Sequence, residues 1–265
     1  MYFEVHGSRT KELLLCIGGW GLLTGSHFEI LNERLRERYQ IIVFDHRGLG
    51  ASDPGSCSDS TADYALDAEA VLRACDSLPV HVIGQGGLGA AVAQMLAVQE
   101  PTFLKDVVLT AGWAWPEPFH TMQLEALYAL RRDSGFEAFR GLCLTLCNLP
   151  ETVNDSTYVS PRGWTGPANI QERTEAHLQL IRANITHDAR LVLGRIRCPV
   201  LIVCGGEDIL GGPRLARDLQ QRISGARLEI LEGVPHVIGS VQGASNRYAA
   251  MVDEFFQENY TNTTS

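Results

Sequence analysis

The sequence predicts an α/β protein in which a mostly parallel central sheet is flanked by helices and carries an inserted helical cap. Short apolar runs alternate with amphipathic segments over most of its 265 residues, as in chains that form a parallel sheet. One apolar run, residues 81–83, breaks at glycines and continues as an Ala-rich segment, which is typical of a strand, a tight turn and a helix. Residues 113–187 show helical periodicity and no strong strand signal. We therefore expect one core domain, 1–112 and 188–265, interrupted by a cap over 113–187.

The elements of the core follow one another from the N-terminus. Residues 2–6 alternate in polarity and are followed by a turn and by the apolar run 13–17, so we expect an outer hairpin that leads into a buried strand. Further strands are expected at residues 41–44, 80–83, 107–109, 200–203 and 228–231. Helices are expected at residues 30–38, 64–77, 87–98, 213–223 and 245–258 in the core, and at 121–132, 135–147 and 170–183 in the cap.

The composition limits the class of protein. A hydrophobic fraction of 45% suits one large domain with a deep core. The net charge of -9 and the lack of a basic stripe argue against a nucleic acid or an anionic membrane as partner. The first residues are too few and too polar for a signal peptide, and no run of about 18 apolar residues is present to span a bilayer. We expect a cytoplasmic monomer or homodimer that acts on a small molecule.

The seven cysteines indicate a reducing compartment. Their number is odd and several, such as Cys16 and Cys204, lie in apolar strand-like runs, which is typical of small buried residues. Cys143 and Cys147 have helical spacing, but no further Cys/His cluster completes a metal site. We expect neither a metal nor a cofactor.

Five short motifs along the chain point to one family. In order they are Gly18-Gly19-Trp20-Gly21, Asp45-His46-Arg47-Gly48-Leu49-Gly50-Ala51-Ser52, Gly84-Gln85-Gly86-Gly87-Leu88, Gly205-Gly206-Glu207-Asp208 and Pro235-His236. Together they resemble the α/β-hydrolase superfamily over nearly the whole chain. In that family a Gly-x-Ser-x-Gly elbow places a nucleophilic serine on a strained turn. Here the serine position is Gly86, and Leu88 stands where the family usually has glycine.

The resemblance implies that Asp208 is the acid of the family's triad and His236 its base. A histidine accepts and returns a proton near neutral pH, and a buried carboxylate fixes its tautomer and stabilises the imidazolium. A Gly-Glu-Asp run taken alone is often only a loop, and a histidine after proline is often a surface residue. The order of the motifs favours the catalytic pair.

The resemblance also implies an oxyanion hole formed by the backbone N–H groups of Trp20 and Gly87. Backbone donors survive substitution, although the family's usual His-Gly is Gly18-Gly19 here. An apolar strand followed by a glycine turn would look the same in a protein that has no oxyanion to bind.

Gly86 decides which chemistry is open. Glycine cannot form an acyl-enzyme, so the covalent two-step route is closed at this position. The glycine is consistent with inactivation of a serine esterase or hydrolase by a Ser→Gly exchange, although Leu88 favours natural divergence. Glycine also relaxes a turn that no longer carries a reactive serine.

Three functions compete. In the first, a His236–Asp208 dyad acts as general base on a water molecule or on an acidic substrate proton, which covers serine-independent hydrolysis, C–C cleavage and condensation or cyclisation. In the second, the protein binds a ligand without catalysis, although such a protein has no need of the dyad. In the third, Gly84 to Gly89 binds a dinucleotide, but that fingerprint needs an acid after the next strand, whereas Asp106 precedes it.

The expected cap suggests the character of the ligand. Aromatic residues concentrate in or beside it: Trp113, Trp115, Phe119, Tyr128 and Trp164. They favour a bulky apolar or aromatic substrate, although core packing is the commoner use of such residues. Arg131, Arg132 and Arg162 either bind a carboxylate or, as we expect, are solvated surface charges.

Overall fold

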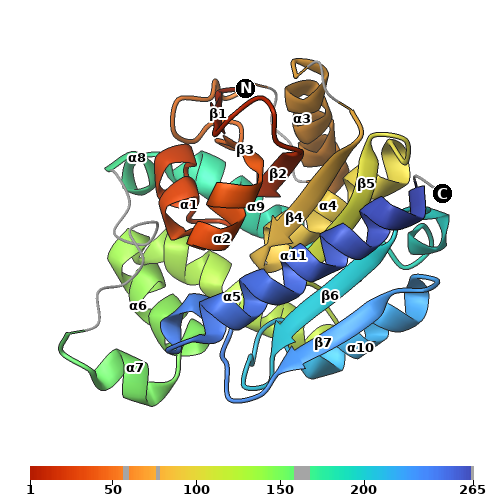
Figure 1. Cartoon of the computed structure of the whole chain (residues 1–265). Helices are drawn as coiled ribbons and strands as arrows, with labels where there is room; N and C mark the ends of the chain where they lie inside the picture. The colour runs from red at the N-terminus through yellow and green to blue at the C-terminus, as the bar shows by residue number, and fades with distance from the viewer. Residues whose placement is uncertain (56–59, 76–77, 158–167, 264–265) are drawn as a thin grey trace.

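The computed structural model describes residues 1–55, 60–75, 78–157 and 168–263, and it confirms the predicted fold class. In this part of the chain a seven-stranded sheet has the order β1-β3-β2-β4-β5-β6-β7 (Figure 1). The strands are β1 (Phe3–His6), β2 (Leu13–Ile17), β3 (Gln40–Phe44), β4 (Val80–Gln85), β5 (Leu104–Thr110), β6 (Val200–Gly205) and β7 (Arg227–Leu231). All neighbouring pairs are parallel except β1 and β3.

The expected outer hairpin of the first two strands is wrong. Strand β1 pairs with β3, from Phe3 opposite Phe44 to His6 opposite Ile41, and β2 lies between β3 and β4. Every residue of β2 is buried, which is typical of a parallel strand that has a neighbour on each edge and helices on both faces. The half-exposed β1 is left with the outer edge of β3, where one side can face water.

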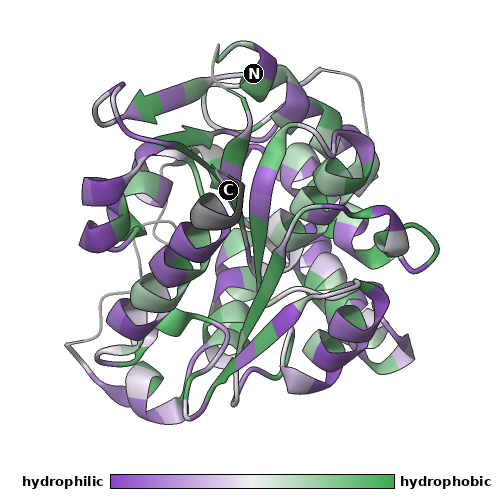
Figure 2. Ribbon diagram, turned by 45° about the vertical axis from the view of Figure 1, so that its right-hand side comes forward, coloured by the Kyte–Doolittle hydropathy of each residue, from purple (hydrophilic) through white to green (hydrophobic). Residues whose placement is uncertain are grey.

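Helices cover both faces of the sheet because the alternation of side chains gives each face its own apolar set. Leu14 and Cys16 of β2 pack with α2 (Glu33–Arg38) and α11 (Ala244–Thr263), and α1 (Thr24–Ile30) lies on the same face. Leu15 and Ile17 pack on the opposite face. That face is covered by α3 (Thr61–Arg73), α4 (Gly86–Gln99) and α10 (Pro213–Arg222). Figure 2 shows the central strands mostly hydrophobic and the surrounding helices striped with hydrophilic residues.

Where the structure describes it, the chain between β5 and β6 is helical, as expected. It contains α5 (Pro118–Asp133), α6 (Gly135–Cys147), α7 (Pro150–Asn154), α8 (Ala168–Glu172) and α9 (Thr174–Thr186), which we call the insertion. Helix α5 packs against α6 and α9, and the three share a small core around Leu127, Phe139 and Ile181. Helix α9 also contacts α4 of the core domain. The boundaries at residues 113 and 187 stay a prediction.

Short 3-10 turns, η1 (Leu193–Arg195) and η2 (Ile238–Ser240), complete the elements. Within the described ranges no helix is long and apolar enough to cross a membrane. The loops that follow β2, β3, β4, β6 and β7 carry the five motifs of the sequence. In a parallel sheet these loops meet at the carboxyl edge of the strands, where ligands bind.

Candidate active site

The turn between β4 and α4 presents Gly86 to a cavity. Gly86 has a φ of 66°, in the left-handed region. A β-carbon built on it would lie 3.8 Å from His236 Nε2 and 3.9 Å from the Cα of Gly19, which is ordinary contact. A side chain at this position would therefore have room and would face the imidazole.

The next residue, Gly87, is required by packing. A β-carbon on Gly87 would lie 1.9 Å from the indole of Trp113, a buried side chain that also lines the cavity. The N–H of Gly87 belongs to the first turn of α4, where backbone donors have no partner inside the helix and an anion is stabilised. Trp20 also lines the cavity, and its indole N–H donates to Asn184 Oδ1 at 2.6 Å. The oxyanion hole of Trp20 and Gly87 stays a prediction.

Asp208 and His236 are brought together by the loops after β6 and β7. His236 Nδ1 donates to Asp208 Oδ2 at 2.9 Å, and the buried Asp208 accepts two backbone N–H groups at Oδ1, from Leu210 at 2.8 Å and Gly211 at 3.0 Å. Burial alone lowers the pKa of His236, but the charge of Asp208 and its hydrogen bond outweigh burial and raise it above the usual 6.5. With the proton on Nδ1, the lone pair of Nε2 faces Gly86 and is available as a base.

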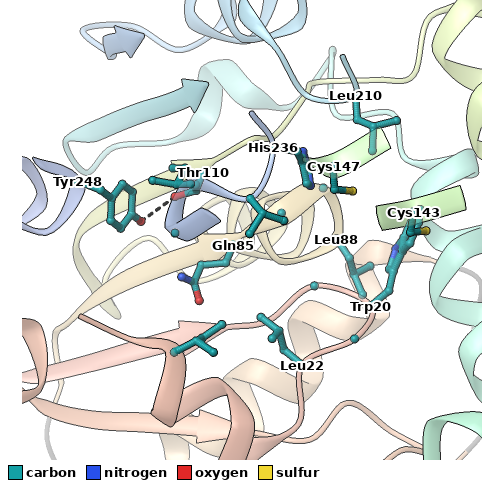
Figure 3. Close-up of a pocket in the computed structure, with 18 of the residues that line it drawn as sticks. Trp20, Leu22, Gln85, Leu88, Thr110, Cys143, Cys147, Leu210, His236 and Tyr248 are labelled. Carbon is teal, nitrogen blue, oxygen red and sulfur yellow. Dashed lines mark hydrogen bonds between the residues drawn. The ribbon is translucent and has the colours of Figure 1, made fainter. Parts of the chain in front are cut away.

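The cavity beside this pair has a volume of about 220 Å³. Figure 3 shows His236 near its middle, with a mostly apolar side formed by Trp20, Leu88, Cys143, Cys147 and Leu210. Among the described residues that line it, none is a lysine, arginine, aspartate or glutamate. The interior therefore suits an uncharged, largely apolar molecule.

Of the aromatic residues expected to bind substrate, Trp113 alone lines this cavity among those that the structure describes. The ring of Trp115 lies under the guanidinium of Arg190, 4.0 Å from its carbon. Phe119 is 62% exposed, and Tyr128 packs against Arg182. Trp164 lies outside the described residues.

The structure describes two of the three arginines that the sequence predicts to be solvated, and it places them differently. The expectation of a solvated charge is wrong for Arg131, which is buried and donates to His177 Nδ1 at 3.0 Å and to the carbonyl of Ile170 at 3.0 Å. These bonds join α5 to α8 and α9, so Arg131 holds the insertion together. Arg132 is exposed and pairs with Asp133, as expected, whereas Arg162 lies outside the described residues.

Three polar residues to which the sequence assigns no role lie at the other side of the cavity, namely Gln85, Thr110 and Tyr248; Asn32 and Ser245, which are hydrogen-bonded to each other, also line it. Gln85 ends β4 and Thr110 ends β5, so both stand at the carboxyl edge of neighbouring strands. A polar residue at the end of an apolar strand is the signal that would have found the first two. Tyr248 comes from α11 and gives no such signal.

This fold and this placement of residues define an α/β-hydrolase. Residues 12–240 match the family described as alpha/beta hydrolase fold, and the chain belongs to that family of enzymes.

Two curated relatives are similar over most of their length. RutD of Caulobacter sp. (strain K31), whose name ascribes a carbamate hydrolase activity to it, is 27% identical over 87% of this chain and 86% of its own. The pimeloyl-[acyl-carrier protein] methyl ester esterase of Neisseria meningitidis serogroup A is 30% identical over 83% of this chain and 69% of its own. Among solved structures, the enol-lactonase from Burkholderia xenovorans LB400 has a TM-score of 0.83 at 18% identity, with 97% of this chain and 96% of that one covered.

Proposed function

We propose that this α/β-hydrolase works without a nucleophilic serine and uses His236, oriented by Asp208, as a general base on a bulky apolar or aromatic small molecule. One observation carries the proposal. Nε2 of His236 lies 3.8 Å from the position of a β-carbon on Gly86, so the base faces an empty nucleophile position inside an apolar cavity. A base held in the right tautomer next to a space for the substrate is what proton transfer requires.

The chemistry follows from the atoms that surround this space. Nε2 takes a proton from a water molecule, in serine-independent hydrolysis, or from a C–H or O–H of the substrate, in C–C cleavage, condensation or cyclisation. The backbone N–H groups of Trp20 and Gly87 stabilise the alkoxide or enolate that forms, and the imidazolium then returns its proton. Serine enzymes without their nucleophile keep only about 10³–10⁴-fold acceleration over water, so lyase-like chemistry is favoured over hydrolysis.

The names of the relatives agree with a reaction at a carbonyl group. A carbamate hydrolase and a methyl ester esterase both act on a carbonyl whose oxygen becomes negative during the reaction. An enolate from a ketone or lactone places the same charge on the same kind of atom. Conversion of a carbonyl compound is therefore the common element of the proposal.

The Gly86→Ser variant tests the site directly. We expect its turnover of an aryl ester to exceed that of the parent about a hundredfold or more, because the hydroxyl would lie within reach of Nε2. Gly86→Ala is the matched control, since it adds the β-carbon without the hydroxyl. The gain should disappear in the Gly86→Ser, His236→Ala double variant. Absence of any gain would contradict the assembled base and oxyanion hole and favour a protein that only binds its ligand.

A further inference from the structure

The polar side of the cavity is built by two neighbouring strands. Gln85 of β4 is the register partner of Thr110 of β5. Partners on adjacent parallel strands point to the same face, about 5 Å apart. That face is the one covered by α11, because Ile83 and Val108, two residues earlier on each strand, pack with α11. Both polar side chains thus emerge where the sheet ends and the cavity begins.

A buried histidine fixes which end of the Gln85 amide faces the cavity. His27 of α1 is fully buried, and burial lowers its pKa to about 4, so it is neutral and carries one N–H. Its Nε2 is hydrogen-bonded to Gln85 Oε1, whereas its Nδ1 has no partner among the described residues. A buried N–H without a partner is expensive, so the proton belongs on Nε2 and donates to Oε1. The NH₂ group of Gln85 is then left for the cavity.

The second polar pair supplies one more donor. Thr110 Oγ1 and Tyr248 Oη are 2.7 Å apart and both side chains are buried. Burial raises the pKa of Tyr248, so its phenol keeps its proton. Two hydroxyl groups share one hydrogen bond, which leaves one of their two protons for a ligand. The polar side therefore offers donors from Gln85 and from this pair, and it suits a hydrogen-bond acceptor.

The charges of the side chains around the cavity limit the kind of hydrogen-bond acceptor that can bind there. None of the described lining residues is acidic, and none is a lysine or an arginine that would neutralise a carboxylate. A buried anion without a partner is far more costly than a buried neutral carbonyl. Figure 3 shows Gln85, Thr110 and Tyr248 toward one end of the cavity and Trp20, Leu88, Cys143 and Cys147 toward the other, with His236 between them.

We propose that Gln85, held by His27, is a substrate-orienting residue that binds a neutral carbonyl oxygen together with the Thr110–Tyr248 pair. This inference rests on the proposed function and adds the substrate class: an uncharged molecule with an apolar or aromatic body at one end and, at the other, a carbonyl group separate from the one whose oxygen the backbone N–H groups of Trp20 and Gly87 stabilise. The carbonyl lies on the polar side of the cavity. The apolar body lies against Trp20 and Leu88. The substrate carbon between this body and the carbonyl group on the polar side then faces Nε2 of His236.

Three probes with the same heavy-atom skeleton test the assignment: 4-phenylbutan-2-one, 3-methylbutylbenzene and 3-phenylpropanoate. Their Kd values are measured by titration calorimetry on the parent protein and on Gln85→Met, which keeps the length of the side chain and removes the amide. We expect the Kd of the ketone to rise about tenfold in Gln85→Met, the effect of one lost hydrogen bond, while that of the hydrocarbon changes less than twofold. The parent should bind the carboxylate more weakly than the ketone.

Two further variants make the result decisive. Gln221→Met changes an exposed glutamine of α10 and should alter none of the three Kd values. The Thr110→Val, Tyr248→Phe double variant removes both hydroxyl groups, and with them the donor, so it should weaken the ketone selectively, and it carries the test if Gln85→Met does not fold. Equal weakening of ketone and hydrocarbon, or tighter binding of the carboxylate, would overturn the assignment. Binding needs no turnover, so a failed gain of esterase activity in Gly86→Ser leaves this result interpretable.

Discussion

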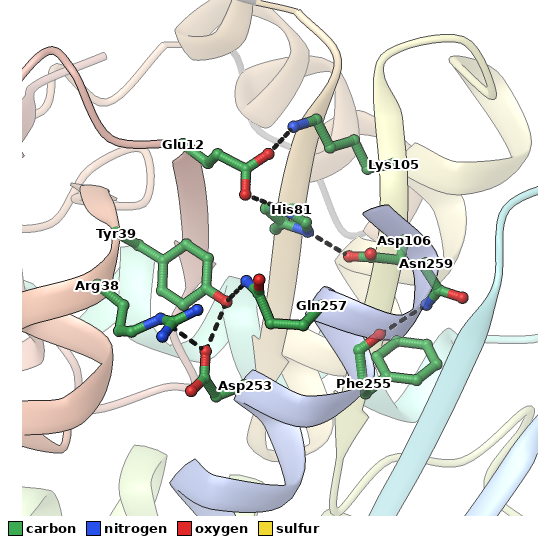
Figure 4. A network of polar contacts seen from close by, with 10 residues as sticks. All are labelled: Glu12, Arg38, Tyr39, His81, Lys105, Asp106, Asp253, Phe255, Gln257 and Asn259. Carbon is green, nitrogen blue, oxygen red and sulfur yellow. Dashed lines mark hydrogen bonds and ion pairs between the residues drawn. The ribbon is translucent and has the colours of Figure 1, made fainter. Parts of the chain in front are cut away.

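Among the residues that the structure describes, two His–Asp pairs are alike in geometry and differ in their surroundings. His236 Nδ1 lies 2.9 Å from Asp208, and His81 Nδ1 lies 2.8 Å from Asp106 (Figure 4). The first pair joins two loops at the carboxyl edge of the sheet. The second joins register partners on β4 and β5 near the opposite end of these strands. A hydrogen bond between the two side chains therefore does not by itself identify a catalytic pair.

The difference lies in what the second ring nitrogen faces. Nε2 of His236 faces the cavity beside Gly86. The ring of His81 is enclosed by Phe256, 4.5 Å away between centroids, and by Tyr39, and its Nε2 lies 3.6 Å from a carboxylate oxygen of Glu12. The proton of one pair can reach a substrate, whereas the other pair can only hold β4, β5 and their neighbours together.

The largest expected effect separates the pairs by activity. In the Gly86→Ser background, Asp208→Asn should lower kcat for an aryl ester by about 10²–10⁴, because the amide no longer holds the imidazole in its basic tautomer. Asp106→Asn in the same background should leave kcat within about threefold once folded protein is compared. Steady-state kinetics on protein of verified circular dichroism measures both. A similar loss in both variants would remove the functional distinction.

Stability should separate them in the opposite direction. Asp106→Ala leaves His81 buried without its partner and should lower the free energy of unfolding by about 3 kcal/mol or more. Asp208→Ala should lower it by roughly 1–2 kcal/mol, since water from the cavity can replace the lost acceptor. Urea denaturation gives both values. If Asp208→Ala were the more destabilising change, the His236–Asp208 pair would be the one that contributes more to stability.

Asp208 also determines the expected pH dependence. A base must be neutral to act, so turnover by Gly86→Ser should fall as the pH drops through the pKa of His236, which the charge of Asp208 keeps above 6.5 although burial opposes it. In Asp208→Asn the raising cause is gone and burial remains, so the acidic limb should move to lower pH. The pH profile of kcat/KM reports the shift. A limb that stays in place would mean that another group titrates.

The sequence predicts the fold well because its signals are local. Apolar runs, glycine turns and amphipathic segments each give one element, and the order of the motifs points to Asp208 and His236. Contacts between distant segments give no such signal. Tyr248 and Thr110 form a hydrogen bond although they are 138 positions apart in the sequence. The packing of α5 within the insertion leaves Phe119 exposed, which a count of aromatic residues does not reveal. His81 and His236 likewise differ only in what folds around them.

The smallest expected effect concerns the turn at Gly86, which faces the His236–Asp208 pair. Gly86 has a positive φ, and an alanine in this conformation costs about 1–2 kcal/mol, while the space around its β-carbon is free. Gly86→Ala should therefore lower the free energy of unfolding by about that amount, as measured in urea. The adjacent Gly87→Ala should cost more, because its β-carbon would overlap Trp113. Equal losses would mean that the turn at Gly86 is as tightly packed as its neighbour, and the room for a substrate next to His236 would be absent.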